Sequence, residues 1–100
     1  MPYAIEITDV AYDELVGIKA FYRRQIIDAI DVQLVSEPMT QTRNRKILIG
    51  VQLNFEHELP IWERRVGQYR VDYDVNEESL TVSIRAVRQK PPHTTTEQSV

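Results

Sequence analysis

The sequence predicts an α+β fold: an N-terminal strand, an antiparallel helical hairpin, and a three-stranded antiparallel meander that completes one sheet. Three observations support this prediction. Apolar and polar residues alternate near the N-terminus, and apolar residues recur at helical spacing in the segment that follows. The last third of the chain contains three β-rich segments separated by two tight turns. Because consecutive elements are usually adjacent in space, these pieces should form one packed unit.

The first half of the chain supplies one strand and two helices. Every second side chain is apolar over residues 3–8, which is typical of a half-buried strand. Thr8 or Asp9 can cap the helix that follows, whose apolar residues recur at helical spacing as far as Ile18. A second helix is expected over residues 23–35, and its short connection to the first predicts an antiparallel pair.

The second half begins with an irregular segment and ends in strands. Residues 36–60 have no clean period, although "TRNRKILIG" could form a short strand or a turn. Three strands are then expected over residues 62–66, 69–75 and 80–87. Gly67 and Gln68 suit a two-residue hairpin turn, because glycine adopts the positive φ that such a turn requires.

Length and composition indicate one ordinary globular domain. The chain has 100 residues, of which 42% are hydrophobic and 27% charged. We expect a single domain over residues 1–90 and a mobile C-terminal tail over residues 91–100, because two prolines prevent extension of the last strand.

The residue types that are missing exclude several classes. There is no cysteine, which rules out disulfides and thiolate metal sites and fits a reducing cytosol. The N-terminus lacks a signal-peptide pattern, and no apolar run is long enough to span a bilayer. No nucleotide-binding glycine loop or metal-ligand spacing occurs. We therefore expect a cytoplasmic protein with no cofactor, no metal and no membrane contact.

Charge is distributed unevenly along the chain. The net charge is −3, which argues against non-specific nucleic-acid binding. The first forty or so residues are rich in acidic residues, and basic residues gather after them, at Arg43, Arg45, Lys46, Arg64, Arg65, Arg70, Arg85, Arg88 and Lys90. A local basic surface on an acidic protein is therefore expected.

The predicted hairpin brings charged residues together. A two-residue turn sets Arg65 opposite Arg70 and Glu63 opposite Asp72, while the other face, with Trp62, should pack on the helices. Two arginines directly opposite each other repel. Either the diagonal pairs Glu63–Arg70 and Arg65–Asp72 offset that repulsion on a solvated face, or the arginines bind a phosphate, which guanidinium holds bidentately.

Nearly the whole chain, about residues 2–90, resembles the RelE/ParE toxin superfamily, the small toxins of bacterial and archaeal type II toxin–antitoxin modules. The resemblance rests on "RNRKIL", on "WERRVGQYRVDYDV" and on "LTVSIRAVRQK", in that order along the chain. It implies a RelE/ParE-like fold and a toxin that a cognate antitoxin neutralises, in a hetero-oligomer with that antitoxin or as a homodimer.

Three functions are compatible with the resemblance. RelE-like members are endoribonucleases (mRNA interferases) that inhibit translation by cutting mRNA on the ribosome, which makes the ribosome and mRNA the expected partners. ParE-like members inhibit DNA gyrase instead. An attenuated member would mainly bind its antitoxin. The RelE-like function is our leading hypothesis.

The resemblance also assigns catalytic candidates. RNA-cleaving members hold a phosphate-stabilising arginine at the position of Arg70, and Arg65 opposite it could share that role. Lys90 falls about where the family has an arginine at the end of the last strand. Glu63 lies on the appropriate face to act as a base, and His93 could titrate near neutrality.

The match to RNA-cleaving members is incomplete. Several of them carry lysines on the strand "PIWERR", where this chain has Ile61 and Glu63, and their terminal tyrosine has no clear counterpart. Basic residues that could hold RNA or the ribosome are Arg43, Arg45, Lys46, Arg85 and Arg88.

Overall fold

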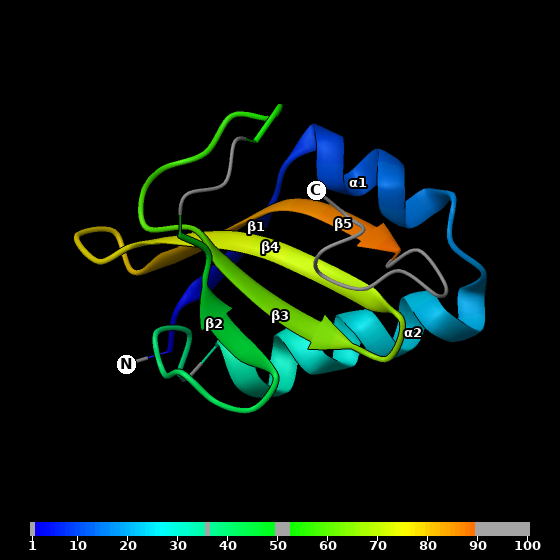
Figure 1. Ribbon diagram of the computed structural model, residues 1–100, viewed down its shortest axis with the longest axis horizontal. Helices are drawn as coiled ribbons and strands as arrows, with labels where there is room; N and C mark the ends of the chain where they lie inside the picture. Colours follow the sequence, from blue (N-terminus) through cyan, green and yellow to red (C-terminus); the bar gives the residue numbers. More distant parts are fainter. Residues whose placement is uncertain (1, 36, 50–52, 90–100) are drawn as a thin grey trace.

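A computed structural model describes residues 2–35, 37–49 and 53–89. Its helices are α1 (Asp9–Val16) and α2 (Ala20–Ala29), the latter continued by a π-helical segment, η1 (Ile30–Leu34). Its strands are β1 (Ala4–Ile7), β2 (Arg45–Ile47), β3 (Trp62–Val66), β4 (Tyr69–Asn76) and β5 (Thr81–Gln89). They form one five-stranded sheet in the order β1-β5-β4-β3-β2, in which β1 runs parallel to β5 and the remaining pairs are antiparallel (Figure 1). The predicted α+β fold is confirmed, with β2 as an additional short strand.

The helices cover one face of the sheet, which we call the helix face. Side chains from both helices pack there against the inward-facing residues of β3, β4 and β5. The buried core consists of Ala11, Leu15, Ile26, Ile30, Leu34, Trp62, Val71, Tyr73, Val82, Ile84 and Val87. The face of the hairpin that carries Trp62 thus packs on the helices, as the alternation of apolar residues predicts.

Thr8 fixes the start of α1 against the sheet. Its hydroxyl oxygen accepts from the backbone N–H of Ala11 at 3.3 Å and donates to the carbonyl of Ile84 at 2.9 Å. The predicted cap is therefore present, and it also anchors the helix to β5. The helix boundaries differ from expectation: α1 ends before Ile18, and α2 begins at Ala20 rather than near residue 23.

An irregularity in the β4–β5 pairing changes the register of the last strand. Asp72 pairs with Ala86 and Tyr73 pairs with Ile84, so Arg85 is an extra residue on β5. A bulge of this kind increases the local twist and redirects the side chain of the extra residue. No helix in the described part of the chain is long and apolar enough to span a membrane. The tail over residues 91–100 lies outside the described residues.

Candidate functional site

The β3–β4 hairpin has the predicted register. Arg65 pairs with Arg70 and Glu63 pairs with Asp72, around a turn in which Gly67 has a φ of 58°. Because Val66, Tyr69 and Val71 pack toward the helices, the alternation of the strands places these four charged residues on the opposite face of the sheet. The hairpin therefore presents both arginines on the side of the sheet that the helices leave uncovered.

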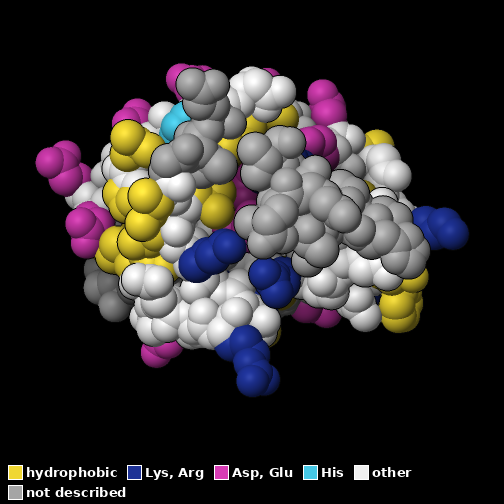
Figure 2. All heavy atoms as spheres, in the orientation of Figure 1, with side chains coloured by type: hydrophobic (Ala, Val, Ile, Leu, Met, Phe, Trp, Pro, Cys, Tyr) yellow, Lys and Arg dark blue, Asp and Glu magenta, His cyan; other side chains and the backbone are white. Residues whose placement is uncertain are grey.

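A third arginine extends this pair across β5. Arg70 pairs with Arg88 on its other side, so three arginines lie in one line across three strands. We call Arg65, Arg70 and Arg88 the arginine row. Arg65 is exposed, and the side chains of Arg70 and Arg88 are 31% and 44% exposed. In Figure 2 some Lys and Arg side chains lie near the centre of the view and others at its lower and right-hand edges, whereas most of the visible acidic side chains lie toward the rim.

Two buried carboxylates lie beside the arginine row. Arg70 lies 3.9 Å from a carboxylate oxygen of Glu63, and Arg88 donates a hydrogen bond to Asp72. The predicted diagonal pair Glu63–Arg70 is confirmed. The predicted pair Arg65–Asp72 is wrong, because Arg88 on β5 occupies the carboxylate of Asp72.

Asp72 has the most unusual environment on this face. It is 0% exposed, and burial raises the pKa of its carboxyl to about 6; Arg88 opposes that rise and the carboxylate of Glu63 adds to it. Among the described residues, Asp72 Oδ1 and Arg70 Nε have no hydrogen-bond partner. Arg70 thus retains an unused donor and Asp72 an unused acceptor, which is uncommon for buried polar atoms.

From its place in the hairpin, the sequence predicts only an ion-pair role for Asp72. The β3–β4 register alone leaves this carboxylate beside two arginines and says nothing of β5. Its pairing with Arg88 depends on the bulge, which no turn signal in the sequence announces. A perturbed carboxyl among charged neighbours is typical of functional sites, although ion-pair networks also produce it.

Strand β2 adds one cation to this face and hides another. Lys46 pairs with Glu63 and is exposed, so its amine lies on the same face as the arginine row. Arg45 pairs with Arg64 on the helix face, is only 4% exposed, and donates to the carbonyl of Glu37. Burial, and then the charge of Arg45, lower the pKa of Arg64.

Arg45 is buried on the helix face, and its predicted role in RNA binding stays a prediction. Arg43 is exposed at the start of the turn before β2 and remains a candidate. Arg85, at the bulge, is half-buried and donates to Asp74 at 2.7 Å, away from the line of the arginine row. Lys90 and His93 lie outside the described residues, so their predicted roles stay predictions.

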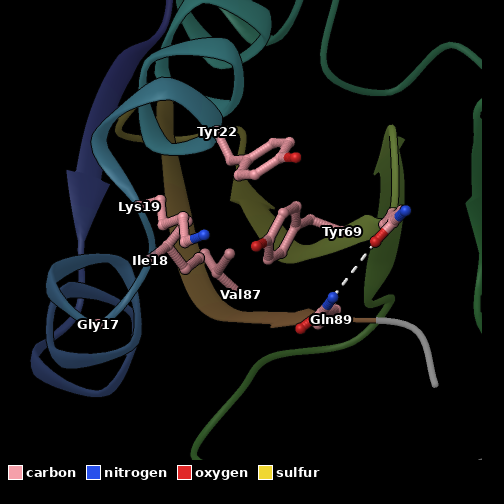
Figure 3. Close-up of a pocket in the computed structure, with 8 residues that line it drawn as sticks. Gly17, Ile18, Lys19, Tyr22, Tyr69, Val87 and Gln89 are labelled. Carbon is pink, nitrogen blue, oxygen red and sulfur yellow. Dashed lines mark hydrogen bonds between the residues drawn. The ribbon is translucent and has the colours of Figure 1, made fainter. Parts of the chain in front are cut away.

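A cavity lies at the same end of the sheet but on the helix face. Its volume is about 400 Å³, and it is bordered by the α1–α2 connection and the ends of β4 and β5 (Figure 3). The rings of Tyr22 and Tyr69 lie 5.8 Å apart at its wall, and Gln89 donates to Gln68 at 3.3 Å. Among the described residues, none of the predicted site residues lines this cavity.

The fold and the arginine row define a small α+β protein with a cationic site on one sheet face. No protein-family model and no curated protein matches the chain. Its structure is similar to a chain of the toxin–antitoxin complex RelBE2 from Mycobacterium tuberculosis, at 25% identity and a TM-score of 0.70. That match covers 90% of this chain and all of the other.

Two further solved structures share the fold. One is the archaeal RelE–RelB complex from Pyrococcus horikoshii, at 22% identity and a TM-score of 0.71, covering 92% of this chain and 99% of the other. The other is the isolated Escherichia coli RelE toxin, at 18% identity and a TM-score of 0.71, covering 97% and 92%. The chain therefore has the RelE fold.

Proposed function

We propose that this chain is a toxin of the RelE kind that inhibits translation by binding, and cutting, mRNA on the ribosome. The observation that carries the proposal is the arginine row on the face of the sheet opposite the helices. Guanidinium groups bind phosphate oxygens bidentately and keep their charge at every physiological pH, so three in line suit a phosphodiester backbone.

RNA cleavage through the 2′-hydroxyl places specific demands on such a site. The 2′-oxygen bonds to phosphorus while the bond from phosphorus to the 5′-oxygen breaks. A base takes the proton of the 2′-hydroxyl, and an acid returns a proton to the 5′-oxygen. Arg65 and Arg70 would stabilise the charge on the phosphorus oxygens. Lys46 and Glu63, paired across β2 and β3, and Asp72, paired with Glu63 on β4, are groups near the row in strand register that could move a proton.

The site has fewer groups suited to transfer protons than groups suited to bind phosphate. Ile61 and Glu63, which stand where several RelE-type enzymes carry lysines, are 2% and 4% exposed. This chain therefore has no cationic side chain at either of the two positions where those enzymes have lysines. We therefore propose strong binding to RNA and slow cleavage, with Lys90 and His93 as further candidates for the missing acid or base.

We also propose a cognate antitoxin as the partner that silences the toxin. The Pyrococcus horikoshii structure is a complex of RelE with RelB, and the Mycobacterium tuberculosis structure is a toxin–antitoxin complex. On this chain, large apolar side chains are exposed on the outer side of the helices, at Tyr12, Val16 and Phe21. Such side chains suit the apolar face of a partner segment.

Arg70→Ala tests the proposal. Unchecked expression of the parent chain is expected to stop growth and to produce cuts in mRNA, and Arg70→Ala is expected to lower cleavage by about a hundredfold or more. Arg24→Ala removes the same charge from an exposed position on α2 and should leave both effects unchanged. Growth arrest that survives Arg70→Ala while DNA supercoiling is blocked would instead identify a gyrase inhibitor.

A further inference from the structure

Two of the three arginines in the row already form ion pairs with carboxylates of the same sheet. Glu63 and Asp72 lie in the next line of the sheet, directly opposite each other, and each approaches one arginine. Arg70 lies 3.9 Å from Glu63, and Arg88 is hydrogen-bonded to Asp72. Of the three arginines, only Arg65 makes no ion pair with a described carboxylate.

The two members of the Arg88–Asp72 pair differ in their freedom to move. The Arg88 side chain is 44% exposed and can turn toward solvent, whereas the Asp72 side chain is 0% exposed. When Arg88 leaves, the carboxylate stays buried without its main counter-charge, which is unfavourable unless it takes up a proton. Phosphate binding by Arg88 is therefore opposed by a fixed internal anion.

We propose that Asp72 is an internal competitor of the RNA phosphate for Arg88, with Glu63 in the same relation to Arg70. Both carboxylates occupy the arginines when no anion is bound and release them when a phosphodiester arrives. Asp72 takes up a proton in that exchange. This inference rests on the proposed function, since it assigns to a carboxylate the control of affinity at the same site.

The surroundings of Asp72 set the pH at which the exchange operates. Its charged neighbours are Glu63 from β3, Arg70 from its own strand and Arg88 from β5. Burial raises the pKa of its carboxyl to about 6, so a modest further rise brings protonation into the neutral range. Because Arg88 lowers that pKa, loss of Arg88 raises it further, so RNA should bind more tightly at about pH 5.5 than at about pH 7.5.

The test uses the full chain and a 2′-O-methyl oligouridylate, which cannot be cleaved and whose charge is constant over this pH range. Asp72→Asn removes the competing charge with little change of shape. It should bind the oligonucleotide about tenfold more tightly than the parent chain at about pH 7.5, and its affinity should not vary with pH. Asp28→Asn removes the same charge from an exposed position on α2 and should change affinity less than about twofold.

A measurement on the parent chain keeps the inference testable if Asp72→Asn fails to fold. The ¹³C shift of the Asp72 carboxyl, followed against pH, should show a higher pKa with the oligonucleotide than without it. An unchanged titration, or Asp72→Asn with the affinity and pH dependence of the parent, would overturn the inference. In that event loss of binding in Arg70→Ala would still support the proposed function. Binding unaffected by Arg70→Ala would instead contradict that function itself.

Discussion

On β4, Val71 and Tyr73 point to the helices, whereas Arg70 and Asp72 point to the opposite face of the same strand. The helix face holds the hydrophobic core, in which Val71 and Tyr73 are 0% exposed, and the Tyr73 hydroxyl donates to the carbonyl of Pro38 at 2.5 Å. Among the described residues, buried charged atoms without a hydrogen-bond partner occur on both faces, at Arg45 and Arg64 on the helix face and at Arg70 and Asp72 on the opposite face. The two faces differ in what surrounds these atoms: the helix face adds the apolar core that stabilises the fold, whereas the opposite face adds the partly exposed arginine row.

The largest effect should come from the helix face. Ile84 is 0% exposed on β5, so Ile84→Ala should lower the free energy of unfolding by about 2–5 kcal/mol through lost burial and a cavity. Urea denaturation followed by circular dichroism measures this loss. Val32→Ala, at a residue that is 72% exposed, should change stability by less than about 0.5 kcal/mol. Similar losses at the two positions would contradict the assignment of the core.

The opposite face should make the free energy of unfolding depend on pH, through Asp72. The pKa of Asp72 lies at about 6 in the fold, against 3.8 for the unfolded chain, so between these values the folded state binds more protons. Its contribution to stability is therefore greatest below about pH 3.8 and is lost as the pH rises to about 6. The loss amounts to about 2–3 kcal/mol, and Asp72→Asn should remove it. A parent chain and variant with parallel stability curves over this range would contradict the prediction.

The smallest effect on stability should come from Arg65, the exposed end of the arginine row. Arg65→Ala should change the free energy of unfolding by less than about 0.5 kcal/mol. It should nevertheless reduce the slope of log affinity against log salt for single-stranded RNA by about 0.7, because one phosphate contact is lost. Arg24→Ala provides the comparison, and an equal change of slope in both variants would indicate diffuse attraction by the net charge alone.

Local signals in the sequence were sufficient for the hairpin. Gly67 and Gln68 specify a two-residue turn, and that turn alone sets Arg65 opposite Arg70 and Glu63 opposite Asp72. The apolar alternation then decides which residues meet the helices. The fold class followed from the same kind of local pattern, because the spacing of apolar residues differs between the helices and the strands.

Features that depend on pairing between distant strands could not be read in this way. The bulge opposite Asp72 decides that Arg88 lies beside Arg70, and no composition signal marks it. Arg45 belongs to a basic run that reads as exposed, yet pairing of β2 with β3 turns it toward the helices. The short β2 strand is itself a consequence of that pairing, since three residues carry too little period to be recognised.

The parallel pairing of β1 with β5 joins the two ends of the described chain, since Ala4 has Thr81 as its partner. β5 also lies second in the sheet and supplies Val82 and Ile84 to the core and Arg88 to the arginine row. A chain that stops before Thr81 therefore lacks a central strand as well as one end of the cationic line. The hydrophobic core and the arginine row are therefore completed by the same strand.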